Sequence, residues 1–507
     1  MSIAIVQYIV WFIFVYFVAI LFSFVIAIIM HKIFFDKNYL QKPFNWDMSA
    51  NEYLTSVIIV NVFSVIIAFV ILWITYLISH DQFLWFNIIT SYITNTNLQH
   101  FINQQLTYFT QTTSLYYLQF VAPATGLSVS LSMFRSIFLK KYGNFYRDFI
   151  MSILLLSALT FVVTILFNLL GLSFGYSFSF MAGIKNAPLS LYNAITLLGN
   201  NGGSYITEGI AAGPLMPNSL TAFLDIIVLN VLPFSLIFLI GIVTKNIKLS
   251  VSLLIAILTF FFVFNLIILD KTYVILNSLI PADLNEYSSL SLFYSSISTN
   301  TGAAVFPLNA LSPVQLAAFI TLMLSDSLPG SVGSGFISLI FIIVITIFFS
   351  ALMSGRMPKL FGYKLEYREI KYAVLGYIFH FALVLTAIPL IIFTLHQFNF
   401  SPGYDFTKLL WEVVSASVNN GSDFYGVNGN ISALNIITGM LMLLGRYVPF
   451  YFGIKMTESF INKDKSFTKS DLKLDSLYFS FSLVFFIFLL VIISLLPLLA
   501  LGPLSMG

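Results

Sequence analysis

The sequence of 507 residues contains no cysteine and little charge. The lack of cysteine excludes disulfides, thiolate metal sites and cysteine nucleophiles. Charged residues make up 8% of the chain, far below the roughly 25% typical of soluble domains, which excludes an ordinary soluble protein. The chain also lacks a glycine-rich loop ending in Gly-Lys-Ser or Gly-Lys-Thr, so it has no visible means of binding ATP.

Metal-binding and catalytic patterns are absent as well. The five histidines are His31, His80, His100, His380 and His396, and none of them stands at a paired metal-binding spacing. Nothing in the sequence favours hydrolysis, nucleophilic catalysis or nucleic-acid binding.

The chain is instead rich in long hydrophobic segments. Hydrophobic residues make up 59% of it, and apolar runs long enough to cross a bilayer, about 20 residues each, recur throughout. The sequence therefore predicts an all-α integral membrane protein with about ten transmembrane helices. The predicted spans are residues 3–31, 52–79, 109–134, 146–172, 218–243, 249–269, 313–353, 373–396, 432–457 and 477–501.

The ends and the orientation of the chain follow from the basic residues. The first apolar stretch is too long for a signal-peptide core and follows no basic residue, so it is interpreted as a retained transmembrane helix. With the N-terminus outside, most of the 23 Lys and Arg residues fall in inner loops, as the positive-inside rule requires. Both termini are therefore predicted to lie outside.

Four short polar segments interrupt this apolar chain. They read TNTN (94–97), GNNG (199–202), TNTG (299–302) and VNNG (418–421), and each has an asparagine in second place. One such segment alone is typical of an ordinary turn. Four copies, each between two predicted spans and each on the predicted outer side, favour a shared site.

A second regularity accompanies the first. Fourteen residues before the four asparagines stand Asp81, Asn186, Glu286 and Asp405, and since three of the four are good helix N-caps, a short helix is predicted to begin at each. A helix of about 12 residues measures roughly 18 Å, too short for a hydrocarbon core of about 30 Å. Each is therefore a half-helix that enters the membrane and continues into a polar loop.

These units define the predicted organisation of one membrane domain, residues 1–507. The extra N-terminal helix is 1–35, the four helix–half-helix–loop–helix repeats are 52–134, 146–245, 249–355 and 372–460, and the C-terminal helix is 476–503. Four repeats point to a pseudo-fourfold axis.

The loops have the chemistry of a cation filter. Irregular backbone at membrane depth is tolerated only when it is buried in protein or lines a cavity. The half-helices point their negative dipole ends at the loops, and a ring of backbone carbonyls can replace the hydration shell of K⁺. The predicted K⁺ filter comprises Thr94, Asn95, Thr96, Asn97, Gly199, Asn200, Asn201, Gly202, Thr299, Asn300, Thr301, Gly302, Val418, Asn419, Asn420 and Gly421.

The seventh span is broken at residues 325–335. Asp326, Gly330, Gly333 and Gly335 would then lie inside the membrane, where an acidic residue and a broken helix often mark a gate or ion pathway. The alternative is a glycine-rich kink without a role in transport. Arg446 either neutralises Asp326, guards the inner mouth, or snorkels to the interface. Asp225 is interpreted as a wetted carboxylate near the outer end of its helix.

Several motifs carry a resemblance to a known family. They are TNTNLQ (94–99), LGNNGG (198–203), GSVGSG (330–335), SGRMPKLFGYKLEYREIK (354–371), NNGSDF (419–424), GRY (445–447) and LALGP (499–503). In this order they resemble the potassium-binding A subunit of the Kdp-type potassium-transporting ATPase, within the superfamily of four-repeat potassium transporters. The resemblance covers nearly the whole chain, and the GSVGSG and SGRMP…REIK segments are its most specific parts.

The resemblance implies a function and a set of partners. Gln99 matches a glutamine at the filter mouth, Asp326 an acidic residue before the break, and Arg446 an arginine below the filter. K⁺ would be the transported ion, with no covalent cofactor, in a prokaryotic plasma membrane. The chain would pass K⁺ to a separate P-type ATPase B subunit, beside a single-span C subunit and a small F peptide.

Two other functions remain open from the sequence. A stand-alone or nucleotide-gated K⁺ or Na⁺ channel of the same superfamily would carry the same filter motifs. A membrane-embedded enzyme such as a lipid transferase would need clustered acidic or histidine residues at the inner interface, where the chain has mainly scattered Lys and Arg.

Overall fold

The structure is a computed structural model of the chain. It describes residues 3–35, 44, 46–75, 83–101, 106–107, 109–170, 177–179, 183–186, 189–203, 219–269, 286–303, 308–395, 403–467 and 471–506. Within these ranges the chain is almost entirely helical, and nine helices are long and apolar enough to cross a membrane. The predicted all-α membrane fold is confirmed.

The described part of the chain is built almost entirely from helices, with two short pairs of strands. They are α1 (Ile3–Phe35), α2 (Ala50–Thr75), α3 (Leu84–Ile93), the π-helical turn η3 (Thr110–Leu115), α4 (Tyr116–Leu139), α5 (Phe145–Leu169), β1 (Ser177–Ser179), β2 (Gly183–Asn186), α6 (Leu189–Leu198), α7 (Ser219–Val243), α8 (Ile247–Ile268), α10 (Glu286–Ser298), η4 (Leu308–Ala310), α11 (Pro313–Ser325), α12 (Ser334–Ser354), β3 (Lys359–Leu360), β4 (Tyr363–Lys364), α13 (Tyr367–Thr394), α14 (Tyr404–Ser417), η5 (Gly426–Gly429), α15 (Ser432–Glu458), η6 (Ser459–Asn462), α16 (Leu477–Leu501) and η7 (Pro503–Ser505). The strands form two antiparallel pairs, β1 with β2 and β3 with β4.

The long helices account for the ten predicted spans. Nine of them meet the apolar criterion, and the tenth, α4, is more polar because it carries Arg135 and several serines. Most of α4 is buried inside the protein, so its polar side chains are not exposed to lipid. The seventh predicted span is two helices, α11 and α12, separated at residues 326–333, which confirms the predicted break.

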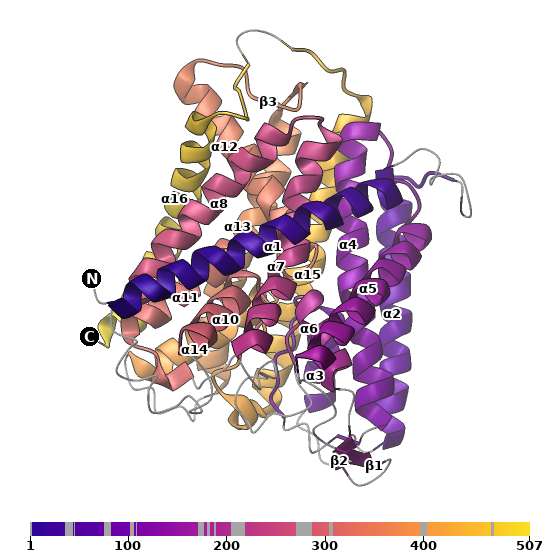
Figure 1. The fold of residues 1–507 in the computed structure, drawn as a ribbon, viewed down its shortest axis with the longest axis vertical. Coiled ribbons are helices and arrows are strands. Elements are labelled where there is room, and N and C mark those ends of the chain that lie inside the picture. Colours follow the sequence, from indigo (N-terminus) through magenta and orange to yellow (C-terminus); the bar gives the residue numbers. More distant parts are fainter. Residues whose placement is uncertain are drawn as a thin grey trace.

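Each short helix lies between two long ones in the chain. The repeating units are α2–α3–α4, α5–α6–α7, α8–α10–α11/α12 and α13–α14–α15, with α1 before them and α16 after them. Figure 1 shows α3, α6, α10 and α14 together in the lower half of the molecule, the half in which both chain ends are marked. This is the fold with four helix–loop–helix repeats and one extra helix at each end.

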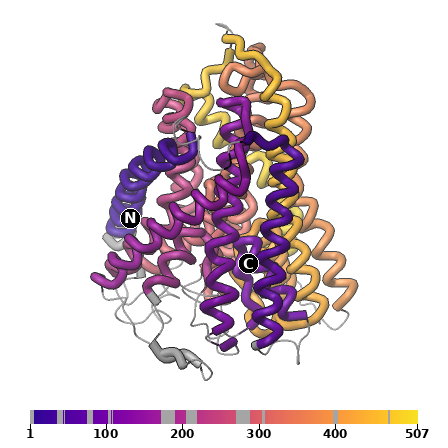
Figure 2. Tube along the Cα trace, turned by 90° about the vertical axis from the view of Figure 1, so that its right-hand side faces the viewer, coloured from indigo at the N-terminus to yellow at the C-terminus, as the bar shows by residue number. Residues whose placement is uncertain are grey.

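Burial separates central helices from lipid-facing ones. In the most apolar window, 89% of α7 is buried inside the protein, against 33% for α1 and 28% for α2 and α5. α1 crosses the outside of the bundle obliquely and packs against α7 (Figures 1 and 2). The exposed apolar side chains of α1, α2 and α5 therefore face the bilayer, because water would not tolerate so wide an apolar surface.

The starts of the short helices differ from the prediction. Asn186 lies in β2, before α6 begins, while Glu286 is the first residue of α10 and Asp405 lies in the first turn of α14. Asp81 lies outside the described residues, and α3 begins after Phe83. The N-cap assignment is therefore wrong for Asn186 and also for Asp405, because the N-cap of α14 is Gly403. Fourteen residues is the distance from each of these residues to the asparagine of its loop, and each short helix ends two residues before that asparagine.

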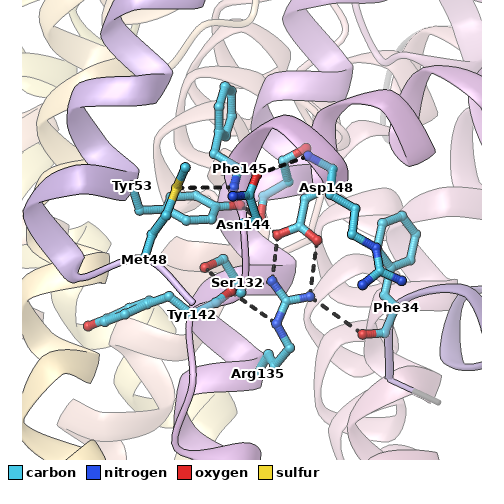
Figure 3. A network of polar contacts seen from close by, with 12 residues as sticks. Phe34, Met48, Tyr53, Ser132, Arg135, Tyr142, Asn144, Phe145 and Asp148 are labelled. Carbon is cyan, nitrogen blue, oxygen red and sulfur yellow. Dashed lines mark hydrogen bonds and ion pairs between the residues drawn. The ribbon is translucent and has the colours of Figure 1, made fainter. Parts of the chain in front are cut away.

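One buried ion pair joins the ends of four helices, α1, α2, α4 and α5. Figure 3 shows the Arg135 guanidinium of α4 between the Asp148 carboxylate of α5 and the carbonyl of Phe34 at the end of α1. Tyr53 of α2 donates its hydroxyl to Asp148 Oδ2 at 3.0 Å. Arg135 also donates from Nε to the Tyr142 carbonyl at 3.0 Å. Arg135 is therefore a structural link between helices.

Arg135→Met is expected to destabilise the protein by about 3–5 kcal/mol, because it leaves the Asp148 carboxylate buried without a cation. Chemical or thermal unfolding of the purified protein in detergent measures this loss. Lys141→Met, at an exposed residue nearby, is the matched control and should change stability little. Equal stability of the two variants would contradict the structural role of the ion pair.

Candidate ion-binding site

The four polar segments share one backbone conformation. The second-place asparagines Asn95, Asn200, Asn300 and Asn419 are left-handed, with φ of 62°, 49°, 48° and 57°. The next N–H bonds to the carbonyl five residues earlier in every case: Thr96 to Ser91, Asn201 to Thr196, Thr301 to Ser296 and Asn420 to Ser415, at 2.8–2.9 Å. This is the Schellman ending of a helix, and asparagine is one of the few residues other than glycine that adopt it readily.

The asparagine side chains explain why glycine is not used there. Asn200 Nδ2 donates to the Leu229 carbonyl of α7 at 2.8 Å, and Asn419 Nδ2 donates to the Met442 carbonyl of α15 at 2.9 Å. Asn300 Nδ2 likewise reaches the Met323 carbonyl of α11 at 3.3 Å. Each of these three amides thus ties its loop to the helix that follows, which glycine could not do.

The fourth place of each segment contacts the neighbouring loop. Gly202, Gly302 and Gly421 have positive φ. A Cβ on Gly202 would lie 2.2 Å from the Thr301 carbonyl oxygen, and one on Gly302 would lie 2.2 Å from that of Asn420. At Gly421 the added carbon would lie 1.6 Å from the Thr96 oxygen. Loop 2 (199–202) therefore packs on loop 3 (299–302), loop 3 on loop 4 (418–421), and loop 4 on loop 1 (94–97).

Asn97 completes the circle, because it occupies the fourth place of loop 1. Its Nδ2 donates to the Gly202 carbonyl at 2.7 Å, and Asn95 Nδ2 donates to the Gly199 carbonyl at 2.9 Å. Loop 1 is thereby joined to loop 2. The four loops form a closed ring in which every loop contacts the next.

Loops on opposite sides of the ring are alike. Loops 1 and 3 each hold a threonine pair, Thr94 with Thr96 and Thr299 with Thr301, with hydroxyl oxygens 2.7 Å apart. Loop 4 bridges both of them, because Asn419 Nδ2 donates to Thr96 Oγ1 at 2.9 Å and Asn420 Nδ2 donates to Asn300 Oδ1 at 3.0 Å. These bonds hold the ring without a full charge in any of the four segments.

Oxygen acceptors outnumber donors around this ring. The side chains of the four segments are buried, each at most 3% exposed. Among the described residues, no hydrogen bond reaches Oδ1 of Asn95, Asn97, Asn200 or Asn419. Oε1 of Gln99 is likewise unpaired there, while Gln99 Nε2 donates to the Tyr92 hydroxyl at 3.2 Å. A buried, neutral site with surplus oxygen acceptors suits a monovalent cation.

The break between α11 and α12 lies directly against loop 3. The Ser331 N–H donates to the Thr299 carbonyl at 2.7 Å, and a Cβ on Gly330 would lie 2.0 Å from the same oxygen. Asp326, left-handed with φ 41°, accepts from Asn300 Nδ2 at 3.0 Å. The acidic residue and the glycines of the break are therefore in contact with the loop ring.

Arg446 reaches the same break from α15. Its guanidinium donates to Ser334 Oγ at 2.5 Å, to the Val332 carbonyl at 3.1 Å and to the Ala122 carbonyl of α4 at 3.2 Å. The residue is 1% exposed, so the snorkelling alternative is wrong. Within the described part of the chain the guanidinium forms no ion pair with Asp326.

Close packing accounts for the other two glycines of the break. A Cβ on Gly333 would lie 2.2 Å from the Gly126 carbonyl oxygen, and one on Gly335 would lie 2.4 Å from that of Leu328. The break is thus packed tightly against α4 and folded back on itself.

Asp225 is a correction to the sequence analysis. The side chain was expected to be wetted, but it is fully buried on α7 and accepts from Asn193 Nδ2 of α6 at 3.0 Å. Helix packing around the loops buries this level of α7, which hydropathy along one helix does not reveal.

A cluster that the sequence analysis missed lies beside loops 1 and 4. His100, Glu412 and Asp423 are buried together, although they come from three separate segments. Spacing along the chain does not bring these three residues together, because Glu412, the nearer of the two acids, lies 312 residues after His100. The available signal was the position of His100 directly after Gln99 and of Asp423 two residues after Gly421.

Comparisons with known proteins agree with this architecture. The chain is 28% identical over 460 residues to a potassium-transporting ATPase potassium-binding subunit of Alicyclobacillus acidocaldarius, covering 83% of this chain and 81% of that protein. It is 28% identical over 500 residues to the potassium-transporting ATPase potassium-binding subunit 1 of Staphylococcus aureus, covering 90% and 89%. The solved potassium transporter TrkH of Vibrio parahaemolyticus has a similar fold, with a TM-score of 0.56 at 15% identity over 88% of this chain and 97% of that one.

The family itself is defined by a profile comparison. The profile described as the potassium-transporting ATPase A subunit matches residues 3–506, nearly the whole chain. The chain therefore belongs to the potassium-transporting ATPase A subunit family.

Proposed function

We propose that the chain is the K⁺-binding and K⁺-selective translocating subunit of an ATP-driven potassium importer. The observation that carries the proposal is the closed ring of four equivalent, buried loops, each at the carboxyl end of a short helix. Names of similar proteins as potassium-binding subunits of a potassium-transporting ATPase support it.

The filter acts through oxygen atoms, without formal charge. Carbonyl and amide oxygens of residues 94–97, 199–202, 299–302 and 418–421 would replace water around a dehydrated K⁺. The negative dipole ends of α3, α6, α10 and α14 add a favourable potential. Gln99, two residues after loop 1, would bind the ion at the mouth. Hydrogen bonds from the asparagine side-chain amides to carbonyls of α7, α11 and α15 would keep the ring from closing around a smaller ion.

The pathway beyond the filter is proposed to begin at the break. Asp326 bonds to Asn300 of loop 3, and Arg446 holds the backbone at 332–334. A carboxylate here would attract a cation that leaves the ring. The positively charged guanidinium, held in place by its hydrogen bonds, would repel cations and so limit leak. Gly330, Gly333 and Gly335 allow the backbone to approach loop 3 and α4.

The energy has to come from another subunit. Because the sequence has no ATP-binding loop, we propose a separate P-type ATPase B subunit as the partner that receives K⁺. A single-span C subunit and a small F peptide complete the proposed complex in a prokaryotic plasma membrane.

ATP hydrolysis by the complex tests this function. The chain is purified gently from its native membrane and ATPase activity is titrated with K⁺ and then with Na⁺. We expect an ATPase subunit to co-purify and its activity to rise with K⁺ and not with Na⁺. K⁺ flux through the bare chain in liposomes, without a co-purifying ATPase, would instead identify a channel.

The proposed orientation has its own test. The chain lacks cysteine, so single cysteines label cleanly. Asn428→Cys in η5 and Lys364→Cys in β4, both at exposed residues, are expected to react with an impermeant maleimide from outside and inside respectively. The reverse pattern in sealed cells would overturn the orientation, including both termini outside.

A further inference from the structure

We infer that His100, Glu412 and Asp423 form a binding site for a divalent transition-metal ion of the Zn²⁺ class. His100 lies after loop 1, Glu412 on the short helix α14, and Asp423 just after loop 4. Their ligand atoms all lie within 4.8 Å of one another. This site lies beside the proposed K⁺ filter, and metal binding to it does not depend on the proposed transport function.

The imidazole is oriented as a metal ligand. His100 Nδ1 lies 2.7 Å from Asn435 Oδ1, and Asn435 Nδ2 donates to Asn430 Oδ1 at 2.8 Å. The second bond turns the Asn435 oxygen toward the ring, so Nδ1 carries the proton. Nε2 then faces the two carboxylates. A hydrogen bond from the other ring nitrogen to an oxygen is the usual outer-shell support of a metal-binding histidine.

The carboxylates are also held in place, and each keeps an atom for a ligand. Asp423 Oδ1 accepts the N–H groups of Tyr425 and Gly426 at 2.7 and 2.8 Å, and Glu412 Oε2 accepts that of Phe424 at 3.2 Å. In the described part of the chain Asp423 Oδ2 receives no hydrogen bond, although the residue is 1% exposed. A buried carboxylate oxygen without a partner is costly unless a cation or proton fills its place.

The proton balance favours a divalent ion. His100 Nε2 and Glu412 Oε1 are 2.9 Å apart, so one proton lies between them when the site is empty of metal. With that proton removed, the imidazole is neutral and the two carboxylates carry two negative charges in a buried place. A divalent cation replaces the proton and balances both charges, and the released proton passes to solvent.

The ligand types select the class of metal. Imidazole nitrogen suits Zn²⁺ and other first-row transition ions, whereas Mg²⁺ and Ca²⁺ prefer sites built from oxygen alone. Three protein ligands leave a fourth position open for water. Since His100 belongs to repeat 1 and the two acids to repeat 4, a bound ion cross-links the two loops that meet at Gly421.

Cobalt absorption tests the site directly. The purified full-length chain, stripped of metal, is titrated with Co²⁺ alone, and Zn²⁺ is then added. We expect a visible absorption band that saturates at one Co²⁺ per chain and disappears when Zn²⁺ displaces it. His100→Gln and Asp423→Asn should abolish the band. His31→Gln, at the inner end of α1, is the control and should keep it.

A milder variant separates ligand loss from misfolding. Asn435→Ala keeps all three ligands and removes the support of the ring, so Co²⁺ affinity should fall about 10–100-fold. Zn²⁺ should also raise the melting temperature of the unmodified chain and not that of Asp423→Asn. A folded chain without a saturable band would overturn the site, as would a band that survives both His100→Gln and Asp423→Asn.

Discussion

Gly421→Asp is expected to abolish discrimination between K⁺ and Na⁺. Gly421 has φ 95° and an added Cβ would lie 1.6 Å from the Thr96 carbonyl oxygen. No flexible side chain can move aside, since the contact is with backbone. Loop 4 must therefore shift away from loop 1, and the new carboxylate adds a charge that binds Na⁺ as well as K⁺. The ring then loses the spacing of its oxygen atoms and also gains a negative charge.

The measurement is K⁺ uptake into liposomes that contain the intact complex, with Na⁺ as competitor. The K⁺ preference of the variant should approach unity, and Gly421→Ala should shift it in the same direction through the contact alone. Gly355→Asp is the matched control, because Gly355 also has positive φ but a Cβ there would meet nothing within 4 Å. Unchanged selectivity in Gly421→Asp would refute the assignment of loop 4 to the filter.

Arg446→Met is expected to stop K⁺ transport while leaving the loop ring assembled. The guanidinium donates to Val332, Ser334 and Ala122. Each buried acceptor that loses its donor costs about 1–3 kcal/mol, so the backbone at 332–334 should rearrange. Arg446→Lys keeps the charge but lacks the planar fork that reaches several acceptors at once. It should therefore recover little of the transport.

K⁺ uptake and K⁺ binding, measured separately, check this prediction. Uptake should fall strongly, because the backbone at 332–334 that loses these hydrogen bonds is part of the proposed pathway. Binding should be retained. Arg368→Met is the control, because Arg368 forms a partly exposed ion pair with Glu458 that should contribute little. Normal uptake by Arg446→Met would refute a role for this arginine in the pathway.

The sequence predicts the helices well because their signals are local. Apolar runs as long as 477–501 have few alternatives to a spanning helix, and the break after Ser325 is marked by Pro329 and a group of glycines. The helix starts were predicted less well. Asn186 looked like a cap, but it belongs to β2, and pairing with β1 is a contact that the helix pattern does not contain.

The loop ring was predicted from repetition, and its chemistry from residue type. The left-handed φ of Asn95, Asn200, Asn300 and Asn419 follows from the few conformations open to a helix that ends at asparagine. The sequence could not predict which loops touch, because the contact between Gly421 and Thr96 joins residues of the first and the fourth repeat. Nor could it predict the burial of Asp225, which depends on a neighbouring helix.

By itself the sequence determined the membrane class, the number of spans and the four polar loops, because each depends on local composition and spacing. Only the tertiary structure shows that the four loops form a closed ring and that Arg446 donates hydrogen bonds to the broken helix. It also brings His100 close to Glu412 and Asp423. These contacts join segments far apart in the chain. Only the packing of the long helices brings such segments within hydrogen-bond distance of one another.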